Sequence, residues 1–175
     1  MKLNFKNKLT FIDLSHIEEE QKTKITKNKN LCLKQVIPYV YLSDAESAQE
    51  ESLLKQNNIK TIICLSVRSG CRKFKESYEY LTYDMKDILQ DNIIPLLNKL
   101  THVIDKFEKQ KKNILIHCRK GISRAPIVIL AYLMRYKQMD FEEAFNRLRD
   151  CDDKIDPNVV FLLQVKRFND FKQDK

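Results

Sequence analysis

One stretch of the chain runs from a short apolar segment, through a polar loop, into a second apolar segment. It reads Asn113-Ile114-Leu115-Ile116-His117-Cys118-Arg119-Lys120-Gly121-Ile122-Ser123-Arg124-Ala125-Pro126. Residues 113–117 have the composition of a buried strand. The apolar residues after Arg124 predict a helix, and Pro126 suits its first turn. A strand, a short loop and a helix in direct succession indicate an α/β domain.

The loop itself has the residue types of an anion site. A helix N-terminus exposes unpaired N–H groups, and a loop curled over it aims further N–H groups at the same point. Gly121 lets the backbone approach a phosphate closely, and Arg124 can chelate two phosphate oxygens with its planar fork. Cys118, at the base of the loop, is then favoured as a thiolate and can attack phosphorus in line.

Attack by sulfur on a phosphate ester expels an alkoxide or phenoxide, which needs a proton from a general acid. We choose Asp87, because it is predicted to lie in a loop between a strand ending near Met85 and a helix beginning near Asn92. The local alternatives are Asp84, which falls in the predicted strand, and Asp91, which is better explained as the helix cap. The carboxylate of Asp87 could then activate water to hydrolyse the thiophosphate, so we expect neither a metal nor a cofactor.

From residue 35 onward, short β-like runs alternate with amphipathic helices. We expect strands at 36–42, 59–65 and 78–85 in addition to the one before the loop. We expect helices at 44–57, from about Asn92, from Arg124, at 140–150 and at 157–171, the last with Asp156 as its cap. This pattern predicts one α/β domain with a central sheet flanked by helices.

The composition separates a lysine-rich leader from this domain. The chain has 175 residues, 43% of them hydrophobic, which suits one domain with a proper core. We expect an N-terminal extension over residues 1–34 and the catalytic domain over 35–175. The formal net charge of +8 suits anionic partners. The alternative is that lysines simply cover a solvated surface.

The five cysteines are odd in number and form no Cys-x-x-Cys pair. Reduced thiols in the cytoplasm or nucleus fit this usage best. No apolar run is long enough for a membrane span, and the chain does not begin like a signal peptide. Histidines lack partners at metal-ligand spacing. The sequence does not fix the oligomeric state, although it favours a monomer.

Over about residues 36–171, the chain resembles a dual-specificity phosphatase of the protein tyrosine phosphatase superfamily. The signature His-Cys-x-x-Gly-x-Ser-Arg matches residues 117–124 in full. Residues 155–158 resemble the entry to the family's last helix, residues 37–42 its first strands, and residues 80–93 its acid-loop segment.

The resemblance implies that Cys118 is the nucleophile, that Arg124 binds phosphate and that Asp87 is the acid and then the base. His117 would tune the thiolate, and the rest of the phosphate loop would be Arg119, Lys120, Gly121, Ile122 and Ser123. The family fold is a mixed, mostly parallel sheet with helices on both faces. Its shallow pockets accept phosphotyrosine, phosphoserine and phosphothreonine, so the implied partners are phosphorylated proteins, and nucleic acid is not expected. The chain has no tryptophan, so it lacks the Trp-Pro-Asp acid loop of the tyrosine-only branch.

Two departures from the family pattern affect these expectations. Ala125 stands where a Ser or Thr usually helps the thiolate leave the phosphoenzyme, which predicts slow hydrolysis of the intermediate. Residues 151–154 lack the arginine that holds a second phosphate in some members. Specificity for doubly phosphorylated peptides is therefore not expected.

Other readings remain open. Arg119 and Lys120 could suit phosphoinositides or RNA 5′-phosphates, but Ile122 adds no third charge, so protein substrates are favoured. A phosphoprotein-binding module with little turnover is a further alternative, supported only by Ala125. Cys64 could form a protective disulfide with Cys118 under oxidation, although a small buried residue is the favoured explanation. Redox regulation through Cys71 is equally open.

Overall fold

A computed structural model describes residues 31–66, 77–86 and 92–170. The chain divides into two units, residues 1–30 and residues 31–175, and the described elements all lie in the second. Among these residues, no helix is both long and apolar enough to cross a membrane.

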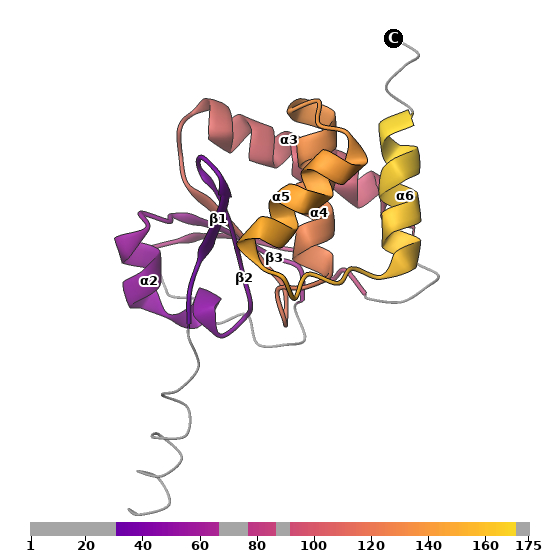
Figure 1. Cartoon of the computed structure of the whole chain (residues 1–175). Helices are drawn as coiled ribbons and strands as arrows, with labels where there is room; N and C mark the ends of the chain where they lie inside the picture. Colours follow the sequence, from indigo (N-terminus) through magenta and orange to yellow (C-terminus); the bar gives the residue numbers. More distant parts are fainter. Residues whose placement is uncertain (1–30, 67–76, 87–91, 171–175) are drawn as a thin grey trace, which may run out of the picture. The chain divides into compact units, whose positions relative to one another are not determined.

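A five-stranded sheet forms the centre of the second unit (Figure 1). Its strands are β1 (Lys34–Ile37), β2 (Val40–Ser43), β3 (Thr61–Cys64), β4 (Glu79–Thr82) and β5 (Ile114–His117). The order is β1-β2-β5-β3-β4, with β1 antiparallel to β2 and all other neighbours parallel. The expected mixed, mostly parallel sheet is confirmed. β5 is the middle strand, so the loop that follows it leaves from the centre of the sheet.

The first strands form a hairpin where the sequence predicts a single strand at 36–42. Ile37 pairs with Val40 across a turn made by Pro38 and Tyr39, whose φ is 69°. Proline cannot donate to a strand ladder, so the chain turns at this position. Lys34, expected at the end of the N-terminal extension, is the first residue of β1.

One face of the sheet is covered by the 3-10 helix η2 (Ser47–Gln49) and by α2 (Glu51–Gln56). Their contact with the strands is a small apolar cluster of Tyr41, Ala48, Leu54, Ile59, Ile62 and Leu115. The sequence predicts one helix at 44–57, but Glu50 is extended (φ −90°, ψ 101°) and divides it. The sequence predicts that Ser43 or Asp44 caps this helix, and Oδ1 of Asp44 accepts a hydrogen bond from Ser47 N–H, at the first residue of η2, at 2.7 Å.

The other face carries the larger core. It is covered by α3 (Ile94–Lys109), α4 (Arg124–Tyr136), α5 (Phe141–Cys151) and α6 (Val159–Asp170), which gather on the side away from α2 in Figure 1. Every residue of α4 from Ala125 to Met134 is buried, and α3, α5 and α6 all pack against this helix. The helix that leaves the loop is therefore enclosed by the core.

The start of α5 agrees with the sequence, and the starts of α6 and α3 depart from it. The helix predicted from about Asp140 begins at Phe141, and Asp140 caps it, with Glu143 N–H donating to Oδ1 at 2.8 Å. For α6 the predicted cap, Asp156, is wrong. The helix begins at Val159, and Oδ1 of Asn158 accepts from Val160 N–H at 2.9 Å. Tertiary contacts explain the shift, since the N–H of Asp156 donates to the carbonyl of Ile122 in the loop.

The start of α3 also differs from the prediction. The predicted cap, Asp91, lies outside the described residues. The cap contact that the structure describes comes from Asn92, whose Oδ1 accepts from Ile94 N–H at 3.1 Å. Pro95 is in the first turn, where its missing N–H leaves no hydrogen bond unmade.

Candidate active site

The loop after β5 lies at the edge of the sheet where the parallel strands end. Ser43 of β2 and Cys64 of β3 are both register partners of His117, the last residue of β5. His117 is buried, and its carbonyl accepts a hydrogen bond from Leu65 N–H at 3.0 Å. Cys118 therefore lies directly after the central strand, at the carboxyl edge of the sheet, where ligands of open α/β sheets bind.

Gly121 turns the loop back against the end of β2. Its φ is +75°, and a Cβ at this position would lie 3.0 Å from the carbonyl of Ser43 and from the nitrogen of Asp44. The same segment holds the other limb of the loop, because Ala45 N–H donates to the carbonyl of Arg119 at 3.3 Å. The left-handed backbone and the lack of space each require glycine here.

A recess of about 640 Å³ opens over the loop. Its described lining combines loop residues with a second segment: Cys118, Arg119, Lys120, Ile122, Ser123, Arg124, Asp156, Pro157, Asn158 and Val159. Cys118 is only 2% exposed, whereas Arg119 and Lys120 are exposed. The structure therefore brings Cys118 and Arg124 into one recess, with the sulfur shielded and the two exposed cations on the loop.

Arg124 is the first residue of α4 and also reaches two neighbouring segments. Its Nη1 donates to the carbonyl of Met85 at 3.1 Å and to the carbonyl of Leu65 at 3.4 Å. These carbonyls lie just beyond the ends of β4 and β3. A guanidinium has five N–H donors in a fixed plane, so bonds from one nitrogen orient the group while its side chain lines the recess.

Asp87 lies outside the described residues, but the chain on both sides of it is fixed. Before it, buried Met85 is held through its carbonyl by Arg124. After it, buried Ile93 donates its backbone N–H to Oε1 of Gln164 in α6 at 2.9 Å. The segment between Met85 and Ile93 is therefore attached at one end to the loop arginine and at the other to α6.

The rival acid Asp84 does not occupy the predicted strand position. β4 ends at Thr82, and Asp84 is an exposed residue beyond it. The predicted place of Asp84 within a strand is therefore wrong, and the choice of Asp87 stays a prediction.

The second wall of the recess was not anticipated from the sequence as part of the site. It comes from the connection between α5 and α6, where Asp156 N–H donates to Ile122 O at 3.0 Å and Asn158 N–H donates to Ser123 Oγ at 3.4 Å. The only sequence signal was the likeness of residues 155–158 to the start of the family's last helix. Pairing of this segment with the loop needs tertiary contacts that no local pattern encodes.

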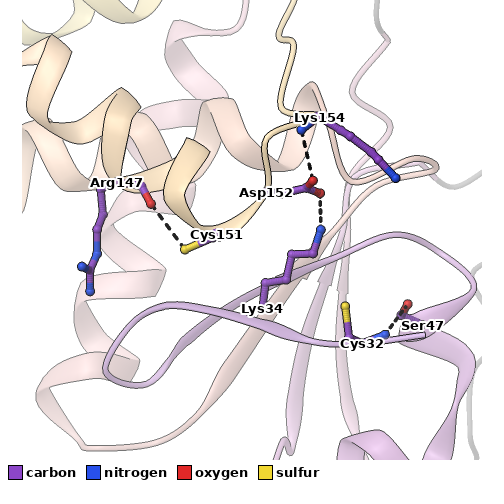
Figure 2. Close-up of polar contacts among 7 residues, drawn as sticks. All are labelled: Cys32, Lys34, Ser47, Arg147, Cys151, Asp152 and Lys154. Carbon is purple, nitrogen blue, oxygen red and sulfur yellow. Dashed lines mark hydrogen bonds and ion pairs between the residues drawn. The ribbon is translucent and has the colours of Figure 1, made fainter. Parts of the chain in front are cut away.

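The segment that forms this wall is also tied to β1 by an ion pair (Figure 2). The ammonium of Lys34 pairs with the carboxylate of Asp152, and Lys154 N–H donates to Asp152 Oδ1 at 3.1 Å. Burial of Asp152 acts to raise the pKa of its carboxyl, but the two donors outweigh burial and the pKa lies below its ordinary value. An ionised Asp152 therefore fastens β1 to the start of the wall.

The thiol of the neighbouring Cys151 is hydrogen-bonded within α5. Its Sγ donates to the carbonyl of Arg147 at 3.3 Å (Figure 2). Burial raises the pKa of the Cys151 thiol, which disfavours the reactive thiolate.

Cys64 lies on the strand next to β5, as the sequence predicts. It is fully buried, and its register partner is His117, one residue before Cys118. Side chains alternate across a strand, and Ile63, not Cys64, shares the larger core cluster with Cys118. This burial fits the favoured explanation of Cys64 as a small core residue, and the disulfide stays a prediction. Cys71 lies outside the described residues.

Ala125 follows Arg124 in the first turn of α4 and is fully buried in the larger core. A side chain at this position faces tightly packed apolar neighbours. The methyl group in place of a hydroxyl therefore completes the core beside the loop, while it removes the hydrogen-bonding group expected there from the family.

Comparisons with known proteins agree with this geometry. Residues 40–171 match the family model described as "Dual specificity phosphatase, catalytic domain". The chain is 33% identical over 133 residues to MAP kinase phosphatase with leucine-rich repeats protein 1 of Dictyostelium discoideum, covering 76% of this chain and 16% of that protein. It is 29% identical over 135 residues to human dual specificity protein phosphatase 1, covering 77% of this chain and 36% of the relative. The chain thus spans well under two thirds of either relative.

Among solved structures, the chain resembles human tyrosine phosphatase-like serine/threonine/tyrosine-interacting protein with a TM-score of 0.74. The two are 25% identical, and the likeness covers 82% of this chain and 99% of that one. The family model spans the chain from β2 to the last helix and so includes both segments that line the recess. The chain therefore belongs to the dual specificity phosphatase family.

Proposed function

We propose that this chain hydrolyses phosphate monoesters on proteins, on phosphotyrosine and on phosphoserine or phosphothreonine, through a cysteinyl-phosphate intermediate. The observation that carries this proposal is the joint presence of Cys118 and Arg124 in one recess at the N-terminus of α4. A thiolate at a helix N-terminus is stabilised by the positive end of the helix dipole. The same N-terminus attracts the phosphate that the thiolate attacks.

In the first step, Sγ of Cys118 attacks phosphorus, so an S–P bond forms as the P–O bond to the substrate breaks. Arg124 holds two of the phosphoryl oxygens and stabilises charge that develops on them. The leaving oxygen takes a proton from the carboxyl of Asp87. The products of this step are the dephosphorylated protein and the phosphocysteine.

In the second step, water attacks phosphorus and gives its proton to the carboxylate of Asp87. The S–P bond breaks, inorganic phosphate leaves and the thiolate of Cys118 is restored. Buried Ala125 offers no hydroxyl to the departing sulfur. We therefore expect this step to be the slower of the two.

The charge of the recess favours proteins as the substrate class. Arg119 and Lys120 are exposed cations on the loop, and Ile122 adds an apolar side chain. Proteins fit this combination better than phosphoinositides or RNA 5′-phosphates do. Those substrates carry several negative charges, which a third basic residue in the loop would bind better than Ile122 does. We also propose a cytoplasmic or nuclear location, because five cysteines without a Cys-x-x-Cys pair fit a reducing compartment.

The test is hydrolysis of p-nitrophenyl phosphate, phosphopeptides, phosphoinositides and triphosphorylated RNA in parallel. We expect Cys118→Ser to lose activity by at least about 10³-fold, and Asp87→Asn by about 10²-fold. Cys32→Ser is the matched control, because Cys32 is exposed and does not line the recess. Undiminished turnover by Cys118→Ser would contradict the proposal, as would faster hydrolysis of the lipid or RNA than of every phosphopeptide.

A second candidate function is capture of phosphoproteins with little turnover. It is favoured by Ala125 and by the name of the solved relative, which describes a phosphatase-like, interacting protein. This function predicts tight binding of a phosphopeptide without release of phosphate. A single-turnover experiment with excess protein separates the two, since a phosphatase transfers phosphate to Cys118 even when the second step is slow.

A further inference from the structure

The first two turns of α6 present an apolar surface to solvent. Val159 is 63% exposed and Leu163 is 55% exposed, and they are the large hydrophobic side chains exposed among the described residues. Their spacing of four residues places them on the same side of the helix. We call Val159 and Leu163 the α6 apolar pair.

The fold does not account for this pair. The core side of α6 is occupied by Phe161, Val165 and Phe168, which are all buried. A polar residue at either exposed position would leave those contacts intact. A β-branched residue such as Val159 is also a weak choice on an exposed helix surface. The apolar character of the pair therefore needs another explanation.

The pair is continuous with the recess over the loop. Val159 lines that recess together with Cys118. Its position is fixed, because the preceding Asn158 is bonded through its N–H to Ser123 Oγ and caps the helix through Val160 N–H. Leu163 lies one helical turn farther, about 6 Å along the axis. A molecule with its phosphate against Cys118 therefore extends over this surface if it leaves the recess on the α6 side.

The recess thus differs between its two sides. The loop side carries exposed Arg119 and Lys120, and the α6 side carries the apolar pair. Inositol headgroups and RNA ends present hydroxyls and charges, which gain little from an apolar wall. A polypeptide can place a large apolar side chain there, and an extended chain covers about 3.3–3.6 Å per residue. Such a side chain would therefore lie within roughly three residues of the phosphorylated one.

We propose that the α6 apolar pair is a specificity-determining surface that binds a large apolar side chain of the phosphoprotein substrate near its phosphorylated residue. This inference rests on the proposed phosphatase activity toward proteins. Burial of one Leu-sized side chain against the pair predicts a preference of about 10-fold in kcat/KM over a polar residue of similar size.

The experiment uses the full chain and phosphotyrosine peptides that carry either Leu or Gln at one of three positions on each side. For each variant, the readout is kcat/KM for the Leu peptide divided by kcat/KM for the Gln peptide. A change in the catalytic recess affects both peptides equally and leaves this ratio unchanged. We expect a Leu/Gln ratio of about 10 at one position for the wild type and a ratio near 1 for Leu163→Gln and for Val159→Thr. Leu163→Met keeps a large apolar side chain and should keep the wild-type ratio. The matched control is Arg167→Gln on the exposed part of α6, which should keep the wild-type ratio.

Four results would overturn the inference. The first is efficient hydrolysis of all peptides with a ratio near 1 at every position, which leaves the proposed function intact. The second is a ratio that survives both substitutions. The third is a wild-type dimer, seen by sedimentation, that Leu163→Gln makes monomeric, because the pair would then bind a second copy. If p-nitrophenyl phosphate is hydrolysed but no phosphopeptide is, protein substrates are excluded and this inference falls with them.

Discussion

The backbone N–H of Ile93 donates a hydrogen bond to Oε1 of Gln164 at 2.9 Å. This bond joins the start of α3 to α6, across 71 residues of sequence. It satisfies a donor that has no partner within its own helix, as the first N–H groups of any helix do. Because Ile93 follows the segment that contains Asp87, we predict that Gln164 acts as a positioning residue for the proposed general acid.

The first prediction concerns this bond. Gln164→Leu should lower kcat/KM by about 5- to 10-fold for phenyl phosphate, a poor leaving group, and less for p-nitrophenyl phosphate, since only the former depends strongly on proton donation. Gln164→Glu keeps an acceptor and should retain most of the activity. Steady-state kinetics on both esters provide the measurement.

The control for this prediction is the double variant that carries both Gln164→Leu and Asp87→Asn. If Gln164 acts through Asp87, adding Gln164→Leu to Asp87→Asn should cause no further loss, because residues that work as a unit are not additive. Equal losses for the two esters, or full additivity, would show that Gln164 is merely structural.

The second prediction concerns Gly121. Gly121→Ala should destabilise the protein by about 1–3 kcal/mol and abolish most activity, because φ is +75° and the new Cβ would lie 3.0 Å from the Ser43 carbonyl. Thermal unfolding and p-nitrophenyl phosphate hydrolysis measure the two effects. Lys111→Gly is the matched control, since Lys111 also has positive φ (55°) but precedes β5, at the opposite end of that strand from the loop. It should leave activity unchanged and stability equal or higher.

The third prediction concerns Ala125. If hydrolysis of the phosphocysteine limits turnover, wild type should show a burst of p-nitrophenol equal to about one product per active site before the steady state. Ala125→Ser should raise the steady-state rate several-fold and shrink the burst. It should also lower stability by about 1 kcal/mol, because a hydroxyl enters a fully buried apolar site. Unchanged turnover in Ala125→Ser would exclude the proposed role of this position.

The fourth prediction concerns the ion pair between Lys34 and Asp152. The pKa of the Asp152 carboxyl is lower in the folded protein than its ordinary value. The pair therefore stabilises the fold above the ordinary carboxyl pKa of about 3.9, and this contribution is lost as the pH falls through the lower folded value. Lys34→Met should cost about 1 kcal/mol at neutral pH, and the difference from wild type should vanish in strong acid.

Urea unfolding across a pH series measures this difference. The control is Lys55→Met, which breaks the more exposed pair between Lys55 and Glu51 on α2. An exposed pair contributes little, so this variant should follow the wild type throughout. A Lys34→Met cost that is constant from neutral pH to strong acid would mean that lost packing of the lysine stem, not its charge, is responsible.

Local sequence specifies the central unit of the fold. Three apolar residues and His117 precede Cys118, a glycine lies three residues after it, and an arginine starts an apolar helix. Local rules alone predict a strand, a loop and a helix from this pattern. The cap contact of Asp140 follows from local chemistry as well. Local sequence is sufficient here because each feature depends on residues within one or two turns.

The segments around this strand, loop and helix depend on tertiary contacts. The hairpin of β1 and β2, the shift of the α6 start from residue 157 to Val159, and the wall at residues 156–159 all depend on pairing between distant segments. Asp156 would cap a helix by local preference, but the hydrogen bond from its N–H to Ile122 holds it against the loop. The loop chemistry is written within eight consecutive residues, whereas the shape of the recess depends on contacts across 35 residues, such as that of Asn158 with Ser123. Only folding brings those residues within reach of one another.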